Sequence, residues 1–264
     1  MRPVEIGDVV LQLEPPEAGR YHAPILLIPG LFQSTACWRP FTTMLAHRGW
    51  EVYALSRQPY ETDDDEPVTP PDYDFAGAIA TATRAARKLG DNVIVFGADV
   101  GAAIALAIAA DVRPMALVLF APAEPAHVGA GLNAQIGFFE KRRRARETGP
   151  VAPPARLAKS VPLPTSIGAE PRALVADLAA GIAYERPRAS PPTLVFAASD
   201  DPLVASEHGA SFAGSPHAKL ARSSMAGRWW PTRQWQAACD EAHRFLILTL
   251  GDRVVEFPEE ILAD

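Results

Sequence analysis

Residues 93–109 read VIVFGADVGAAIALAIA, and this stretch restricts the possible folds more than any other part of the chain. An apolar, β-branched run ends in Gly-Ala-Asp-Val-Gly, and an alanine-rich segment follows directly. The pattern predicts a buried strand, a tight turn and a helix. Glycines two residues before and two residues after Asp99 would let the strand and the helix pass closely. The Asp99 carboxylate would then lie beside the first turn of the helix, where free N–H groups favour negative charge.

The same alternation of strand and helix extends over most of the chain. A strand or hairpin is expected at 3–13, and short apolar runs predict further strands at 24–28, 51–56, 93–97, 114–121, 193–197 and 217–222. Helices are expected after the strand at 93–97 and near 34–48, 73–89, 203–213 and 232–250. Continuous apolar strands between helices indicate a mostly parallel sheet with helices on both faces. We therefore expect one α/β domain over residues 1–264.

Residues 123–190 interrupt this alternation. Helices are expected at 130–147 and 172–184, and the first contains the strongly basic run Lys141–Arg146. Prolines cluster at 150–171, which is typical of a connector. We interpret 123–190 as a helical cap insertion over one end of the sheet.

Composition argues against several kinds of partner. The net charge of −6 disfavours non-specific nucleic-acid binding. The longest run of small apolar residues, 102–110, is too short to cross a bilayer, and the N-terminus lacks the apolar core of a signal peptide. Cys37 and Cys239 lie far apart with no reason to pair, which fits a reduced, cytoplasmic protein. Neither metal-ligand spacing nor a phosphate-binding P-loop is evident, so we expect no metal and no cofactor.

Two simpler interpretations of Asp99 stay open at this point. Aspartate is a common N-cap, so Asp99 could serve only to begin the helix that follows it. A dinucleotide-binding turn is the other option, but Gly97 and Gly101 alone do not give the required glycine spacing.

Four loops, taken in order, resemble those of the α/β-hydrolase superfamily. Residues 28–32 (IPGLF) resemble the loop after the third strand, which supplies half of an oxyanion hole in that family, and 97–101 (GADVG) resemble the nucleophile elbow. Residues 198–204 (ASDDPLV) resemble the acid loop after the seventh strand, and 225–229 (MAGRW) resemble the loop that normally carries the catalytic histidine. The resemblance covers about 24–250.

The resemblance implies roles for individual residues. An aspartate in the elbow is similar to the haloalkane dehalogenase and epoxide hydrolase branch, whose nucleophile is a carboxylate. Asp201 falls at the usual acid position, and Arg228 falls at the position of the catalytic histidine. The resemblance also implies neighbours for Asp99: the backbone amides of Phe32 and Val100 as an oxyanion hole, and Leu31, Trp229 and His127 as pocket residues.

Two positions depart from that branch. Val100 replaces the tryptophan that usually follows the nucleophile, and Arg228 replaces the histidine that activates water. Arginine has no acceptor nitrogen and stays protonated, so it cannot act as that base. Loss of a general base typically costs about 100- to 10,000-fold in rate. A dehalogenase-like cycle is therefore expected to stop at an Asp99 ester, without multiple turnover.

These observations leave three hypotheses. In the first, Arg228 lies between Asp99 and Asp201, and Asp99 performs acid–base chemistry (lyase, elimination, cyclisation or isomerisation) on a small, partly apolar acid, ester or thioester. In the second, the chain is a catalytically degenerate member that binds a ligand or partner. In the third, it is an ordinary ester, epoxide or haloalkane hydrolase that uses another histidine. The basic run Lys141–Arg146 would in addition suit a substrate linked to coenzyme A or to a carrier protein.

Overall fold

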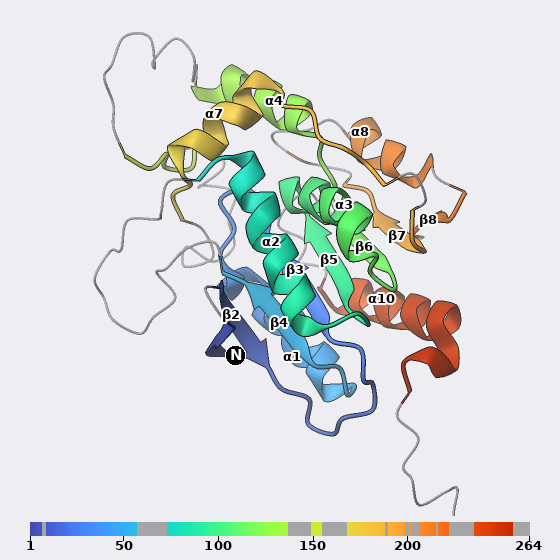
Figure 1. The fold of residues 1–264 in the computed structure, drawn as a ribbon. Helices are drawn as coiled ribbons and strands as arrows, with labels where there is room; N and C mark the ends of the chain where they lie inside the picture. Colours follow the sequence, from blue (N-terminus) through green and yellow to red (C-terminus); the bar gives the residue numbers. More distant parts are fainter. Residues whose placement is uncertain are drawn as a thin grey trace, which may run out of the picture.

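The strands form one eight-stranded sheet in the order β1-β2-β4-β3-β5-β6-β7-β8. Figure 1 shows this sheet and its helices in the computed structural model. The structure describes residues 1–6, 9–56, 73–136, 149–154, 168–187, 190–198, 201, 206–214, 216–221 and 235–255. The strands are β1 (Arg2–Ile6), β2 (Val9–Glu14), β3 (Ile25–Ile28), β4 (Val52–Leu55), β5 (Ile94–Ala98), β6 (Leu117–Phe120), β7 (Thr193–Phe196) and β8 (Ala218–Leu220). The sheet is parallel from β4 to β8, and the hairpin β1–β2 joins it antiparallel.

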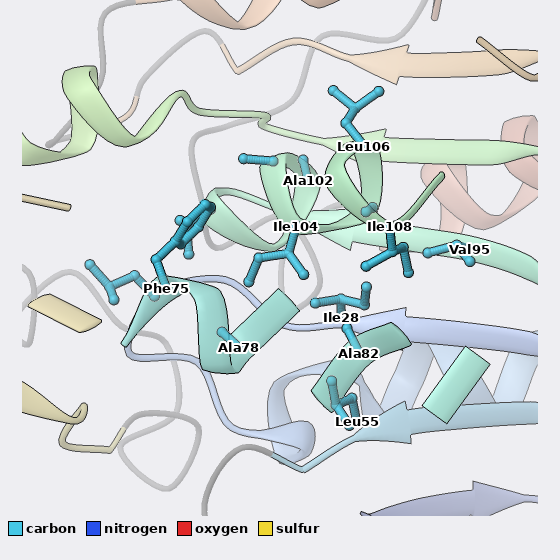
Figure 2. Packing of buried hydrophobic residues seen from close by; sticks show 14 of the residues in the cluster. Ile28, Leu55, Phe75, Ala78, Ala82, Val95, Ala102, Ile104, Leu106 and Ile108 are labelled. Atoms are coloured by element: carbon cyan, nitrogen blue, oxygen red, sulfur yellow. The ribbon is translucent and has the colours of Figure 1, made fainter. Parts of the chain in front are cut away.

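Helices cover both faces of this sheet. They are η1 (Thr35–Trp38), α1 (Arg39–His47), α2 (Phe75–Leu89), α3 (Val100–Val112), α4 (Pro125–Ile136), α7 (Arg172–Ala180), α8 (Ser206–Ala210), η4 (Ser211–Gly214), α10 (Trp235–Leu250) and η6 (Gly251–Arg253). One face packs on α2 and α3, and the other packs on α1 and α10. Figure 2 shows Ile104 and Ile108 of α3 gathered with Ile28 of β3 and Ala82 of α2. The predicted architecture is confirmed.

The strand that precedes Asp99 lies in the middle of the parallel part of the sheet. β5 pairs in parallel with β6, and β6 pairs in parallel with β7. Because parallel neighbours end at the same edge, the loops after these strands gather above the carboxyl end of the sheet. This edge therefore holds the candidate site.

Two predicted helices have different ends in the structure. The segment after Ser34 begins as the short helix η1 without a side-chain cap, and the α-helix starts only at Arg39, next to Pro40. The helix predicted at 172–184 ends at Ala180, because Gly181 adopts φ +70° and the Ile182 N–H bonds back to the Asp177 carbonyl. Local backbone geometry at a glycine thus stops a helix that the apolar pattern would continue.

The helices α4 and α7 pack against each other near the ends of α2 and α3 (Figure 1). Their contact is close: a Cβ at Gly129 of α4 would lie 2.0 Å from the Leu178 carbonyl oxygen of α7. Val128, Leu174 and Leu178 belong to the same buried cluster as α3. The helix α4 begins at Pro125, earlier than the predicted helix at 130–147, and the cap insertion at 123–190 stays a prediction.

Cys37 and Cys239 are both buried free thiols. Among the described helices, none is long and apolar enough to span a bilayer.

Candidate active site

Asp99 occupies a strained backbone conformation between β5 and α3. Its φ and ψ are 51° and −122°, a region that L-residues other than glycine rarely adopt, and its side chain is fully buried. The flanking glycines permit this turn. A Cβ at Gly97 would lie 2.5 Å from the Gly101 carbonyl oxygen, and a Cβ at Gly101 would lie 2.4 Å from the Ile28 carbonyl oxygen. Any larger residue at either position would push the strand and the helix apart.

The Asp99 side chain faces the loop after β3. Its Oδ2 accepts a hydrogen bond of 2.9 Å from the backbone N–H of Leu31, and it makes no capping hydrogen bond to α3. The interpretation of Asp99 as a simple helix cap is therefore wrong. The backbone holds it equally firmly, because its N–H donates to the Phe120 carbonyl and its carbonyl accepts from Ala102 and Ala123.

The loop after β3 is a tight turn from Gly30 to Gln33. The Gln33 N–H donates to the Gly30 carbonyl at 3.1 Å, and Phe32 at the third position has φ +62°. That position usually holds glycine or asparagine, so Phe32 is strained. The Gln33 side-chain oxygen accepts from the Gly30 N–H at 2.9 Å, and a Cβ at Gly30 would lie 2.8 Å from the Asp99 Cβ. The turn therefore needs a glycine at position 30 to bring its amides close to the elbow.

A second buried carboxylate, Glu170, binds the next amide of this turn. Its Oε1 accepts from the Phe32 N–H at 2.6 Å, and the side chain is fully buried. The segment that carries it is bound to the turn and to its own neighbour: the Gly168 N–H donates to the Phe32 carbonyl at 3.1 Å, and Glu170 and Val151 exchange backbone hydrogen bonds of 2.8 and 2.9 Å. The structure thus brings Leu31, not Phe32, to Asp99, and gives the Phe32 amide to Glu170.

Sequence reasoning missed Glu170. The residue lies within 123–190, just before Pro171 at the start of α7, where no periodic pattern marks its neighbours. The contact joins residues 138 positions apart. A lone glutamate before a proline carried no signal that could have singled it out.

The remaining predicted residues are placed only in part. Val100 is the buried first residue of α3, and Asp201 is partly exposed beyond the end of β7. Arg228, Trp229 and the basic run Lys141–Arg146 lie outside the described residues. The convergence of Asp99, Asp201 and Arg228 in one site therefore stays a prediction.

His127, the histidine predicted to line the pocket, is half-buried near the start of α4. Its ring stacks on that of His208 with centroids 3.5 Å apart and an angle of 15° between the planes. Burial lowers the pKa of His127, and the neighbouring His208 adds to the effect. Two other histidine side chains have partners far from the elbow: His47 contacts Glu17, and His243 accepts from Trp50. Among the described residues, no group of three or more His, Cys, Asp or Glu could hold a metal ion.

A family model described as the alpha/beta hydrolase family matches residues 25–257. The chain belongs to the alpha/beta hydrolase family. The match spans the turn after β3, the elbow at Asp99 and the region from β7 to α10, so the resemblance seen in the four loops is confirmed at the level of the family.

Solved structures of this family share the fold. An esterase from Thermogutta terrifontis superposes with a TM-score of 0.61 at 18% identity, covering 93% of this chain and 96% of the esterase. An epoxide hydrolase from Bacillus megaterium gives a TM-score of 0.65 at 13% identity, covering 92% of this chain and 99% of the other. An esterase from Exiguobacterium antarcticum gives 0.64 at 14% identity, covering 90% and 96%. No curated protein matches the chain in sequence.

Proposed function

We propose that this alpha/beta hydrolase is a hydrolytic enzyme whose nucleophile is Asp99 and whose substrate is a small, partly apolar epoxide or alkyl halide. One observation carries the proposal. The buried Asp99 carboxylate sits on a strained turn, with Oδ2 held 2.9 Å from the backbone N–H of Leu31. A side chain serving only stability would not need this conformation, which costs about 1–3 kcal/mol.

The hydrogen bond to Leu31 suits an ester intermediate. Attack by Oδ1 on a saturated carbon forms an alkyl ester, while the halide or the epoxide oxygen leaves with the bonding electron pair. Oδ2 then becomes the carbonyl oxygen of the ester. When water adds to Cγ, negative charge develops on Oδ2, where the Leu31 N–H already donates at a distance suited to an oxyanion.

The comparisons favour hydrolysis over the acid–base scheme built on Arg228. The similar structures include the epoxide hydrolase from Bacillus megaterium and esterases, all of which are hydrolases. They support the hydrolytic hypothesis through the fold only, and the choice of an epoxide or halide rests on the aspartate in the elbow. An ester substrate fits less well, because a carboxylate nucleophile would form an anhydride with it.

Covalent trapping tests the proposal. The protein is mixed with excess styrene oxide or 1-bromobutane, quenched in acid and analysed by intact mass and peptide mapping. We expect an added mass equal to the epoxide, or to a butyl group in place of hydrogen, on the peptide containing Asp99. Asp99→Asn should show none, whereas Asp111→Asn, at an exposed position near the end of α3, should behave as wild type.

An isotope experiment tests the second step. In H₂¹⁸O, water that adds to Cγ leaves ¹⁸O in the Asp99 carboxylate after the alcohol departs. If neither an adduct nor ¹⁸O is found on Asp99 with either substrate, a nucleophilic role for this residue is excluded. A non-hydrolytic reaction or a binding function would then be the better account.

A further inference from the structure

We propose that Glu170 is the general base that activates water against the Asp99 ester. This inference rests on the proposed nucleophilic role of Asp99. It supplies the proton acceptor that the arginine at position 228 cannot provide.

The two carboxylates are anchored to one dipeptide. Asp99 accepts from the Leu31 N–H at 2.9 Å, and Glu170 accepts from the adjacent Phe32 N–H at 2.6 Å. Consecutive Cα atoms are only about 3.8 Å apart, so the two side chains converge on a very small part of the chain. They arrive from different parts of the fold, Asp99 from the end of β5 and Glu170 from the segment before α7.

The hydrogen bond to the Phe32 amide does not by itself require a charged side chain on Glu170. The Phe32 amide needs an acceptor, but a neutral one would suffice. In the same turn, the neutral side-chain oxygen of Gln33 satisfies the Gly30 N–H at 2.9 Å. Burying an ionised carboxylate costs several kcal/mol more than burying an amide, and a second carboxylate nearby adds repulsion. A glutamate at this position, unlike a glutamine, can also accept a proton, which is the property that the proposed base requires.

Formation of the ester changes which of the two carboxyl groups, Asp99 or Glu170, carries negative charge. In the free enzyme the two carboxyl groups are fully buried and are held by adjacent backbone amides. After Asp99 is esterified it carries no charge, and Glu170, once any proton on it has passed to solvent, is the ionised member of the pair. Ester formation thus prepares Glu170 to act as a base in the step that follows.

The hydrolytic step balances with these groups. Glu170 takes one proton from water, and the resulting hydroxide adds to Cγ of the ester. The bond between Cγ and the alkoxy oxygen then breaks, and its electron pair leaves with that oxygen. The departing oxygen takes the proton of the new Cγ–OH group. The alcohol is released, Asp99 is again a carboxylate, and Glu170 is protonated.

The substitution Glu170→Gln separates the two explanations of this residue. Its side-chain oxygen can still accept from the Phe32 N–H, but it cannot take a proton from water at neutral pH. 1-Bromobutane is the probe, because bromide leaves without needing a proton. We expect the butyl ester on Asp99 to form in both proteins, to turn over in wild type and to accumulate in the variant, with hydrolysis slowed by about 100-fold or more.

Two further variants complete the test. Glu185→Gln changes an exposed glutamate that also lies within 123–190 and should turn over as wild type. Glu170→Ala removes both the acceptor and the base, and added formate should restore part of its turnover if a proton acceptor is what is missing. This rescue does not depend on the folding of the glutamine variant.

The outcomes distinguish this inference from the proposed function. An ester that persists in Glu170→Gln supports the base. Wild-type turnover in Glu170→Gln, or no rescue of Glu170→Ala by formate, overturns the base and leaves Asp99 as the nucleophile. Absence of an ester in every variant, wild type included, overturns the nucleophile and the base together.

Discussion

Backbone strain in this protein is concentrated at residues near the candidate site. Four residues other than glycine have positive φ among those described, and three of them, Phe32, Asp99 and Ala121, lie in loops after β3, β5 and β6. Parallel neighbouring strands bring these loops to one edge. Each strained residue is held by backbone hydrogen bonds to a neighbouring segment, as when the Ala121 N–H donates to the Phe196 carbonyl at 2.7 Å. Strain of this kind persists where the surroundings fix it, and it gathers at active sites.

The elbow should not tolerate a side chain at position 101. In Gly101→Ala the new Cβ would approach the carbonyl oxygens of Ile28 and Pro29 to 2.4 and 2.5 Å, both of them rigid backbone atoms. We expect the free energy of unfolding to fall by about 1–3 kcal/mol or more, and Asp99 alkylation to be lost. Chemical denaturation measures the first. Gly19→Ala, which meets nothing within 4 Å, is the control, and equal stability of the two variants would contradict the argument.

Because of His243, the free energy of unfolding should fall in mild acid. Burial lowers its pKa, with Arg48 adding to the effect, and its Nδ1 accepts a 3.0 Å hydrogen bond from the Trp50 Nε1–H, which requires that nitrogen unprotonated. The unfolded chain therefore binds the proton more readily. The stabilisation is complete above the unfolded pKa of about 6.5 and is lost as pH falls through the lower folded value.

Replacing His243 tests this dependence. His243→Gln keeps a side-chain acceptor but does not titrate, so its free energy of unfolding should decline less between pH 7 and pH 5. Some slope should persist, because burial also lowers the pKa of His127. Urea denaturation at several pH values gives the slopes. A variant with the slope of wild type, or of the exposed control His22→Gln, would show that His243 does not contribute.

At the scale of elements, the sequence pattern predicts local structure such as strands, turns and helices well, but it predicts contacts between distant segments poorly. The β5–α3 turn could be predicted, because α3 is apolar on nearly every side and the glycines flanking Asp99 have a steric reason. The contact between Phe32 and Glu170 could not be predicted, since no periodicity places an irregular segment against a turn. The positive φ of Phe32 and the contact of the Leu31 amide with Asp99 could not be predicted either, since a phenylalanine in a sequence does not suggest a positive φ.

The start of α2 shows such a long-range contact with a measurable effect. Asp74 caps the helix by accepting from the Gly77 N–H at 2.7 Å, and Asp177 of α7 accepts from the Phe75 N–H at 3.0 Å. The second carboxylate links α7 to the positive end of α2. Asp177→Ala should lower the free energy of unfolding by about 0.5–2 kcal/mol, in the same range as Asp74→Ala. Denaturation curves test this, with the exposed Asp91→Ala as control; an Asp177 variant as stable as that control would refute it.

At the scale of the whole molecule, the sheet separates two buried hydrophobic clusters that contain different residues. The cluster on the α2 and α3 face contains Leu31, Phe32 and Val100, and extends to α4 and α7. The cluster on the α1 and α10 face contains stacked and edge-on aromatic rings, such as Phe41 and Phe120, and among the described residues it includes neither Asp99 nor Glu170. Side chains on this second face therefore allow the stability of the sheet to be probed from the side opposite to Leu31, Phe32 and Val100.

The two cysteines report on the face of the sheet that is covered by α1 and α10. Cys37 and Cys239 both belong to its cluster and are fully buried. Burial raises the pKa of Cys239 to about 12. Since the thiolate is the reactive form, its fraction at pH 8 would be on the order of 10⁻⁴, and access is blocked as well.

Alkylation of these thiols should therefore follow unfolding of the whole sheet. With iodoacetamide at pH 8, we expect almost no modification of the native protein over hours. In denaturant, both thiols should react, with a midpoint that coincides with the loss of circular dichroism, because α1 and α10 cover strands that run through the centre of the sheet. Intact mass counts the adducts at each denaturant concentration. Modification of Cys239 well below the unfolding midpoint would show instead that α10 opens on its own, and that the two faces of the sheet do not unfold as one cooperative unit.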